Sequence, residues 1–186
     1  MNRKATPILL LAMVAMIVLA VATEWPRSSA STVATRAGAP SARVLNVNQG
    51  DLLRIRVKRD YWNSYTLARS PEGAWRLTDP SDEPASESAV RTLLATVESL
   101  PAVSIIDLPS DDSERHRQYG LWSPSLELTV STSEGDQTVT FGTQTADNKG
   151  VYCARIGQDK VYVTTPEAVQ VLSQDLNVYR SGKTSP

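Results

Sequence analysis

Few residues in the chain could do chemistry, and the densest group of them lies at residues 111–118. Its ionisable members include Asp111, Asp112, Glu114 and His116, which is the single histidine of the chain. Carboxylates and an imidazole can bind a metal ion, but the segment lacks the glycine of an EF-hand loop, and no second ligand cluster accompanies it. We therefore interpret this segment as a solvated surface loop and predict no metal site.

Nucleophilic catalysis has equally little support. Cys153 is the single cysteine, so it can form neither an intramolecular disulfide nor a multi-cysteine zinc site, and we interpret it as a small buried hydrophobe. The signatures Gly-x-Ser-x-Gly, His-Glu-x-x-His and Cys-x-x-Cys are missing. Ser and Lys are plentiful, so a hydrolase built on a Ser–Lys pair or on residues 112–116 stays an alternative. We predict no catalytic residue and no cofactor.

The first 23 residues have the pattern of an export signal. Arg3 and Lys4 precede an uncharged apolar run at residues 7–22. By the positive-inside rule, the amino terminus stays in the cytoplasm and the remaining chain lies outside it.

The fate of this signal is open. Ala20-Val21-Ala22 fits the cleavage pattern of a signal peptide. Against cleavage, the apolar run reaches that site without a polar spacer, and the segment approaches the ~20 residues of a spanning helix. Trp25 would then lie in the interfacial aromatic belt, so we favour a retained signal-anchor. Residues 24–43 are rich in Ser, Ala, Thr and Pro; they predict a flexible tether on the order of 25 Å long, or a disordered leader without a spacing role.

Composition limits the number of domains and the class of partner. A chain of 186 residues with 41% hydrophobic residues allows one compact domain, predicted at residues 44–180. The formal net charge is −1, whereas a nucleic-acid-binding domain carries a basic patch. We expect no nucleic acid partner.

A pattern that occurs twice organises this domain. Residues 67–80 and 153–166 align without a gap. Each copy predicts a strand, a tight turn, a second strand that ends in Thr-x-Pro, and then a helix. In the first copy Pro71 and Gly73 supply the turn, and Trp75 is expected in the core.

Each helix is amphipathic. The first ends at Pro101 and has apolar residues at helical spacing, namely Val90, Leu93, Leu94, Val97 and Leu100. The second begins with Thr165 as N-cap and Pro166 as its first residue. Its buried face comprises Val169, Leu172 and Leu176.

These elements predict an α+β domain of antiparallel β-hairpins with two amphipathic helices. The hairpins and helices would form two pseudo-repeated β-β-α units, related by an approximate two-fold and preceded by the N-terminal hydrophobic helix. Each unit needs the other, or a shared sheet, to cover its apolar face. Further strands are expected at residues 51–59, 103–108, 126–130 and 138–141, and a disordered tail at residues 181–186.

The strand expected at residues 51–59 has one basic face. Leu53, Ile55 and Val57 alternate with the basic residues Arg54, Arg56 and Lys58. Such a face is usually just solvated. Alternatively it meets anionic lipid headgroups or an acidic partner, so these three residues are candidate partner contacts.

Four motifs in this order resemble a known family: Trp75-Arg76-Leu77-Thr78-x-Pro80, Tyr119-Gly120-Leu121-x-x-Pro124, Phe141-Gly142 and Tyr152-Cys153-Ala154-Arg155. The chain resembles, over about residues 51–176, a bacterial family of membrane-anchored extracytoplasmic domains of unknown function. Its members are often encoded beside ABC transporters of the gliding-motility type, and many carry tandem copies of the domain. The resemblance implies export and a transporter-linked context, and it implies no catalytic residue.

Trp122 departs from the family pattern, where an acidic or small polar residue is usual. The segment from Tyr119 to Pro124 predicts a turn in which Gly120 supplies an unusual φ and Leu121 points inward. An exposed Trp122 would be a contact anchor, and a buried one would belong to the core. We expect burial, and retain Trp122 as a candidate partner contact.

The resulting hypothesis is a membrane-tethered extracytoplasmic interaction or accessory module without enzymatic activity, associated with an ABC-type transporter. It would lie in the bacterial inner membrane with a single pass, its amino terminus cytoplasmic and its domain periplasmic or otherwise extracytoplasmic. Its partners would be the membrane, through the N-terminal helix, and envelope proteins or transporter subunits. Alternatives are a cell-envelope hydrolase, a small-ligand-binding protein and a purely structural envelope protein.

Overall fold

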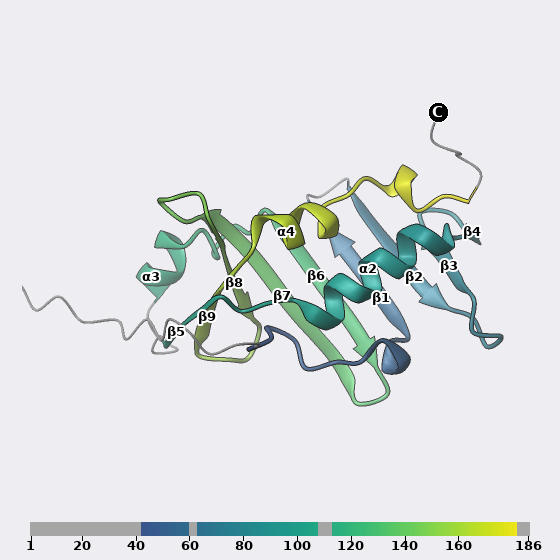
Figure 1. The fold of residues 1–186 in the computed structure, drawn as a ribbon, viewed down its shortest axis with the longest axis horizontal. Coiled ribbons are helices and arrows are strands. Elements are labelled where there is room, and N and C mark those ends of the chain that lie inside the picture. The colour runs from purple at the N-terminus through teal and green to yellow at the C-terminus, as the bar shows by residue number, and fades with distance from the viewer. Residues whose placement is uncertain (1–41, 60–62, 108–112, 182–186) are drawn as a thin grey trace, which may run out of the picture. The chain divides into compact units, whose positions relative to one another are not determined.

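A computed structural model describes residues 42–59, 63–107 and 113–181, and the strands in these ranges form one antiparallel sheet (Figure 1). Nine strands of the described chain follow one another in the order β4-β3-β2-β1-β6-β7-β8-β9-β5. They are β1 (Arg54–Lys58), β2 (Ser64–Arg69), β3 (Trp75–Asp79), β4 (Glu83–Pro84), β5 (Ser104–Asp107), β6 (Leu126–Thr132), β7 (Gly135–Gln144), β8 (Val151–Arg155) and β9 (Lys160–Thr164). The helical elements are η1 (Gln49–Asp51), α2 (Glu87–Ser99), α3 (Ser113–Gln118), α4 (Pro166–Leu172) and η2 (Leu176–Val178).

The main core lies on one face of the sheet because the central strands alternate. Ile55 and Val57 of β1 are inaccessible to solvent. The register pairs Ile55 with Val130 and Val57 with Leu128 of β6, so apolar side chains of neighbouring strands project from the same face. The predicted alternation is confirmed at Ile55 and Val57, whereas Leu53 precedes the strand and is exposed.

The helices α2 and α4 cover this face (Figure 1). The buried residues of α2 are Val90, Leu93, Leu94 and Val97, which confirms the predicted stripe. The predicted cap of α4 is also confirmed, since the Thr165 hydroxyl accepts a hydrogen bond from the Ala168 N–H at 3.4 Å and Pro166 is the first helical residue. Leu172 is inaccessible, but Leu176 belongs to η2 and not to α4.

The predicted fold class is wrong. Instead of an α+β domain made of two β-β-α units, the described chain forms a single nine-stranded sheet with a few short helices. After α2 the chain enters β5, which pairs with β9 at the opposite end of the sheet. After α4 it reaches Arg180, which forms a bridge to Ala85 beside β4. In neither predicted unit does the chain after the helix pair with the hairpin of the same unit. Local periodicity identifies a strand, but it does not say which distant strand is its neighbour.

Several predictions fall outside the described residues. These are the hydrophobic helix at residues 1–23, most of the tether at residues 24–43, and the tail from residue 182 onward. Within the ranges that the structure describes, no helix is both long and apolar enough to cross a membrane. The first described residue, Ala42, accepts a hydrogen bond from the Ala102 N–H at 2.7 Å, so the chain enters the domain beside the end of α2.

Candidate functional site

Trp122 lies on the segment between α3 and β6, and 67% of it is exposed. The predicted burial is therefore wrong. The Arg117 guanidinium carbon lies 5.0 Å from the centroid of the indole ring, a cation–π geometry. Arg117 belongs to α3, so the loop expected at residues 111–118 contains a short helix from Ser113 onward.

The end of α3 explains why Trp122 points outward. Gly120 has a φ of 72°, and its N–H donates to the Arg117 carbonyl at 2.9 Å. The Leu121 N–H donates to the His116 carbonyl, also at 2.9 Å. These two bonds form a Schellman-type cap, which commonly buries the residue after the glycine. Leu121 is that buried residue, and Trp122 follows it on the outer side.

The segment is also pinned to β7. The Tyr119 carbonyl accepts hydrogen bonds from the Thr143 N–H at 2.9 Å and from the Thr143 hydroxyl at 3.2 Å. A Cβ at Gly142 would overlap the same carbonyl, so this contact requires glycine. The rings of Tyr119 and Tyr152 lie 4.5 Å apart. Three motifs that are distant in sequence thus meet here and hold the base of the Trp122 segment in place.

This segment lies on the sheet face opposite to α2 and α4, which we call the back face. Phe141 is inaccessible within the main core, so Gly142 next to it points to the back face. The register places Ala154, Val161 and Ile106 in one row on the back face. All three are buried without belonging to the main core. A second, smaller apolar cluster therefore lies on the back of the sheet.

Arg54, Arg56 and Lys58 also lie on the back face, because Ile55 and Val57 between them point into the core. All three are exposed. The structure gives none of these side chains a hydrogen bond or an ion pair to another described residue. Their spacing on alternate positions of one strand makes a row of charges about 7 Å apart.

The basic row and the Trp122 segment share one surface. Lys58 pairs with Glu127 of β6, and Glu127 pairs with Thr140 of β7, two residues before Gly142. Two strand spacings and two residues separate Lys58 from Gly142, a Cα distance of about 12 Å. Glu127 beside Lys58, and Asp136 on the row of Arg54, interleave negative charges with the positive ones. The surface is therefore of mixed charge and is not a uniform basic field.

The groups with catalytic potential lie in separate parts of the described chain or outside it: Cys153 in the main core and His116 in α3. Burial raises the pKa of Cys153 to about 12, so it is a thiol and not a thiolate at neutral pH, and its interpretation as a buried hydrophobe is confirmed. His116 lies in α3, whereas Asp111 and Asp112 are outside the described residues. In the described ranges, no group of three His, Cys, Asp or Glu side chains could hold a metal.

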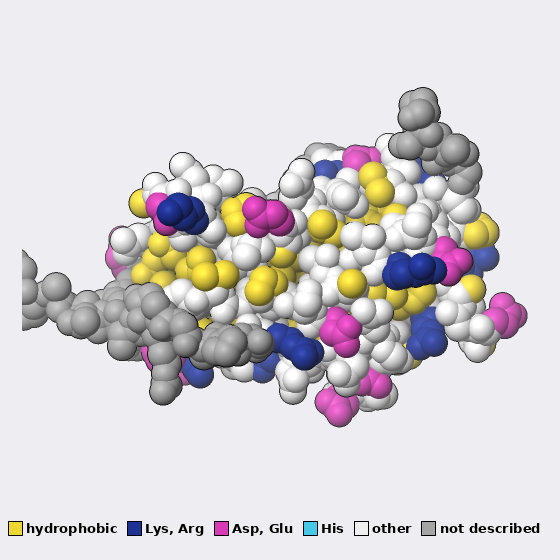
Figure 2. Space-filling model, in the orientation of Figure 1, with side chains coloured by type: hydrophobic (Ala, Val, Ile, Leu, Met, Phe, Trp, Pro, Cys, Tyr) yellow, Lys and Arg dark blue, Asp and Glu magenta, His cyan; other side chains and the backbone are white. Residues whose placement is uncertain are grey.

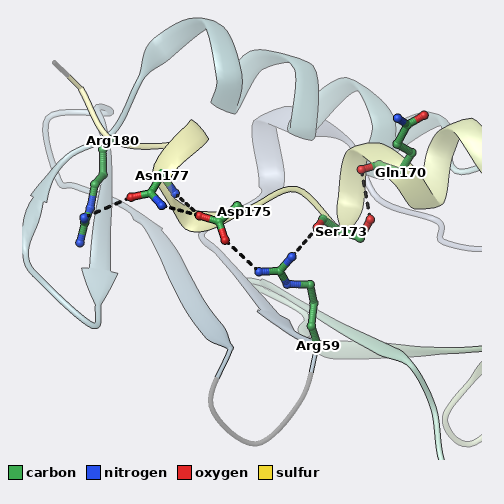
Figure 3. A network of polar contacts seen from close by, with 6 residues as sticks. All are labelled: Arg59, Gln170, Ser173, Asp175, Asn177 and Arg180. Atoms are coloured by element: carbon green, nitrogen blue, oxygen red, sulfur yellow. Dashed lines mark hydrogen bonds and ion pairs between the residues drawn. The ribbon is translucent and has the colours of Figure 1, made fainter. Parts of the chain in front are cut away.

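A network of polar contacts joins the end of β1 to the segment after α4 (Figure 3). Arg59 donates to the Ser173 carbonyl at 3.0 Å and forms an ion pair with Asp175 at 3.2 Å. The backbone N–H of Asn177, followed by the contacts with Arg59, lowers the pKa of Asp175. Asn177 in turn accepts from Arg180 at 3.3 Å. The network fixes the path of the chain from α4 to the edge of the sheet, a structural role.

The structure also contains a groove of about 580 Å³ between α2 and the β2–β3 turn. Figure 2 shows apolar side chains at the surface beside α2, next to a basic and an acidic group. Trp75, expected in the core, is half-buried in the wall of this groove. A second hollow of about 220 Å³ lies near η1 and the β6–β7 turn. Neither hollow is lined by a lysine or a histidine, so neither assembles the Ser–Lys or His116 chemistry of a hydrolase.

Sequence reasoning missed the groove and the partner of Trp122. The groove walls come from η1, the β2–β3 turn, β4 and α2, which are separated along the chain. Arg117 carried a usable signal, because a glycine shortly after a charged segment indicates a helix end, and a side chain in the last turn reaches the residues beyond it.

One of the comparisons with known proteins gives a match, to a family model. No curated protein and no solved structure matches it. A family model matches residues 75–183, more than half of the chain, and this range contains all four motifs. The expected membership of a family of unknown function is thereby confirmed. Over residues 75–183, the chain belongs to the family described as Domain of unknown function (DUF4340).

Proposed function

We propose that this protein is a membrane-tethered extracytoplasmic interaction module, an accessory without enzymatic activity that docks onto an ABC-type transporter in the bacterial inner membrane. Support for the tether comes from Arg3, Lys4 and the apolar run at residues 7–22. Support for the transporter context comes from the resemblance of the four motifs. The docking surface is the part of the back face that carries Trp122 and the basic row of β1.

The observation that carries this proposal is a tryptophan that is exposed and yet held on a pinned segment. A large aromatic side chain in water gains free energy when a partner covers it, and tryptophan is enriched among residues that dominate binding. The cap at Gly120 and the bonds from Thr143 to Tyr119 fix the backbone that leads to Trp122. Little conformational freedom of that backbone is then lost on binding.

The basic row of β1 would orient the partner on the docking surface. Arg54, Arg56 and Lys58 make no ion pair with a described residue, so their charges are available to an acidic surface. Exposed charges at the rim of an interface mainly speed association and select the partner. We therefore assign the anchoring role to Trp122 and the steering role to the basic row.

The test is site-specific photocrosslinking in native membranes with the full chain. A photoreactive amino acid replaces Ser123, which is exposed next to Trp122. The expected result is a crosslink to a transporter subunit that falls at least tenfold in Trp122→Ala, because a hot-spot tryptophan contributes about 2 kcal/mol or more, about 30-fold in affinity. Val178→Ala is the matched control, since Val178 is 46% exposed in η2, after α4 and away from the back face, and its loss should leave the crosslink intact. Equal crosslinking in both variants would contradict the proposal.

The groove beside α2 supports one alternative, a small-ligand-binding protein. Its volume of about 580 Å³ lies within the usual range of small-molecule sites. Ligand binding there and docking through Trp122 are compatible, because the groove lies on the helix side of the sheet and Trp122 on a segment that packs on the back face.

A further inference from the structure

The groove beside α2 has apolar walls. Its apolar lining consists of Ala74, Trp75, Pro84, Ala85, Val90 and Leu94. One wall is the side of α2, and the other is the end of the β2–β3 hairpin with β4 beneath it. The apolar part of this lining favours the hydrocarbon part of a ligand.

The hairpin wall is rigid. Gly73 has a φ of 89°, and its N–H donates to the Ser70 carbonyl at 2.9 Å. The Ser70 N–H donates to the Ala74 carbonyl at 2.7 Å, which closes the turn. These bonds fix the shape of the hairpin tip that forms this wall of the groove.

The charged groups of the groove come from α2. Arg91 and Glu87 form an ion pair of 2.7 Å, and their side chains are 73% and 87% exposed. An ion pair this exposed is weak and easily exchanged. The guanidinium has five N–H donors, and the Glu87 carboxylate occupies only part of them. The ion pair with Glu87 thus shows that Arg91 binds a carboxylate, which is the group that a ligand would supply.

The backbone near the groove disfavours an extended peptide as ligand. The Trp75 carbonyl accepts from the Ala85 N–H at 3.2 Å, so β3 is paired on this side. The next edge is covered as well, since the Ser181 N–H and hydroxyl both donate to the Pro84 carbonyl, at 3.4 and 2.8 Å. A peptide that binds by adding a strand would need free backbone groups here. Recognition must therefore use the side chains of the groove, whose apolar walls are joined by Gln49, Glu87 and the cation of Arg91.

We propose that this groove binds a free monoacyl carboxylate, with its hydrocarbon chain along Ala74, Trp75 and Ala85 and its carboxylate on Arg91 in place of Glu87. No covalent step is involved. The site is separate from the docking surface of Trp122, so it stands whether or not the docking proposal does.

The probe is decanoate with a diazirine near the end of its hydrocarbon chain, added to the full chain in phosphatidylcholine nanodiscs. Mass spectrometry locates the labelled residues after illumination. Arg91→Gln removes the carboxylate partner, and Ala74→Trp fills the groove from the exposed turn. Arg56→Gln is the matched control, because Arg56 is an exposed arginine on the opposite face. Far-UV circular dichroism checks that each variant keeps its fold.

The expected result is labelling concentrated on the groove lining, reduced about two- to fivefold in Arg91→Gln, at least tenfold in Ala74→Trp, and unchanged in Arg56→Gln. Unlabelled decanoate should compete, and a probe of the same chain length with a trimethylammonium head should not label the groove. Labelling spread over other exposed apolar residues, such as Val103 and Ile156, would overturn the site. Equal labelling by the cationic probe, or full labelling of Arg91→Gln, would overturn the assignment of the carboxylate.

Discussion

Gly142 of β7 lies directly against the carbonyl group of Tyr119, so that even a methyl group at position 142 would overlap it. Tyr119 and Gly142, which are separated along the chain by the whole of β6, are thereby in backbone contact. This contact places the segment with Trp122 on the back of the sheet.

Gly142→Ala should lower the free energy of unfolding by about 2–3 kcal/mol, the upper range for overpacking, because the overlapping atom is backbone that is bonded to Thr143. Urea unfolding measures the change. Gly50→Ala serves as control, since a Cβ there meets no atom within 4 Å and should change stability by less than about 0.5 kcal/mol. Similar values for the two variants would mean that the segment is not held as described.

Leu121 and Trp122 should respond oppositely to truncation. Leu121→Ala removes a buried side chain and should cost about 2–3 kcal/mol of stability. Trp122→Ala removes an exposed one and should change stability by less than about 0.5 kcal/mol, while abolishing the crosslink. Thermal unfolding separates the two effects. A large loss of stability in Trp122→Ala would show that its ring packs on the domain and is not available to a partner.

Arg59→Ala should destabilise the protein by about 1 kcal/mol, because it removes the bonds to Ser173 and Asp175 (Figure 3). The partly exposed side chain limits the effect. Arg56→Ala, which removes an arginine without such bonds from β1, just before Arg59, is the control and should be neutral within about 0.5 kcal/mol. If both variants unfold at the same urea concentration, the network contributes nothing to stability.

Cys153 should make the protein less stable in alkali. Its pKa rises from an ordinary 9.0 to about 12 on folding because of burial. Between these values the unfolded chain has lost the proton and the folded chain keeps it, so the contribution is complete below pH 9 and is lost as the pH rises toward 12. Urea midpoints at pH 8 and pH 10 should therefore fall more in the wild type than in Cys153→Ala. Parallel falls in both would assign the slope to other groups, such as the buried tyrosines.

Sequence patterns captured local structure and missed long-range pairing. The alternation at Ile55 and Val57 and the stripe from Val90 to Val97 follow directly from burial on one face, so periodicity reveals them. The pairing of β5 with β9, and of Arg180 with Ala85, depends on where each helix delivers the chain. No short window of sequence contains that information.

The candidate sites show the same division. The basic row was predicted correctly as one face of a strand, because alternation alone determines it. Trp122 was misjudged, because its exposure depends on the cap at Gly120 and on which of two adjacent apolar residues turns inward. The groove was missed because the hollow arises only when four separate elements meet.

The crossing connections have a consequence for copies of this domain placed side by side. The strand β5 completes one end of the sheet, next to β9. It is reached through a single connection after α2, the helix that follows β4 at the other end. A neighbouring copy that has not yet paired its own β5 exposes the same β9 edge, so β5 of one copy fits the β9 edge of the next. Tandem or crowded copies are thus prone to domain swapping of β5. The order in which β5 and β9 emerge during synthesis determines how long an edge stays unpaired.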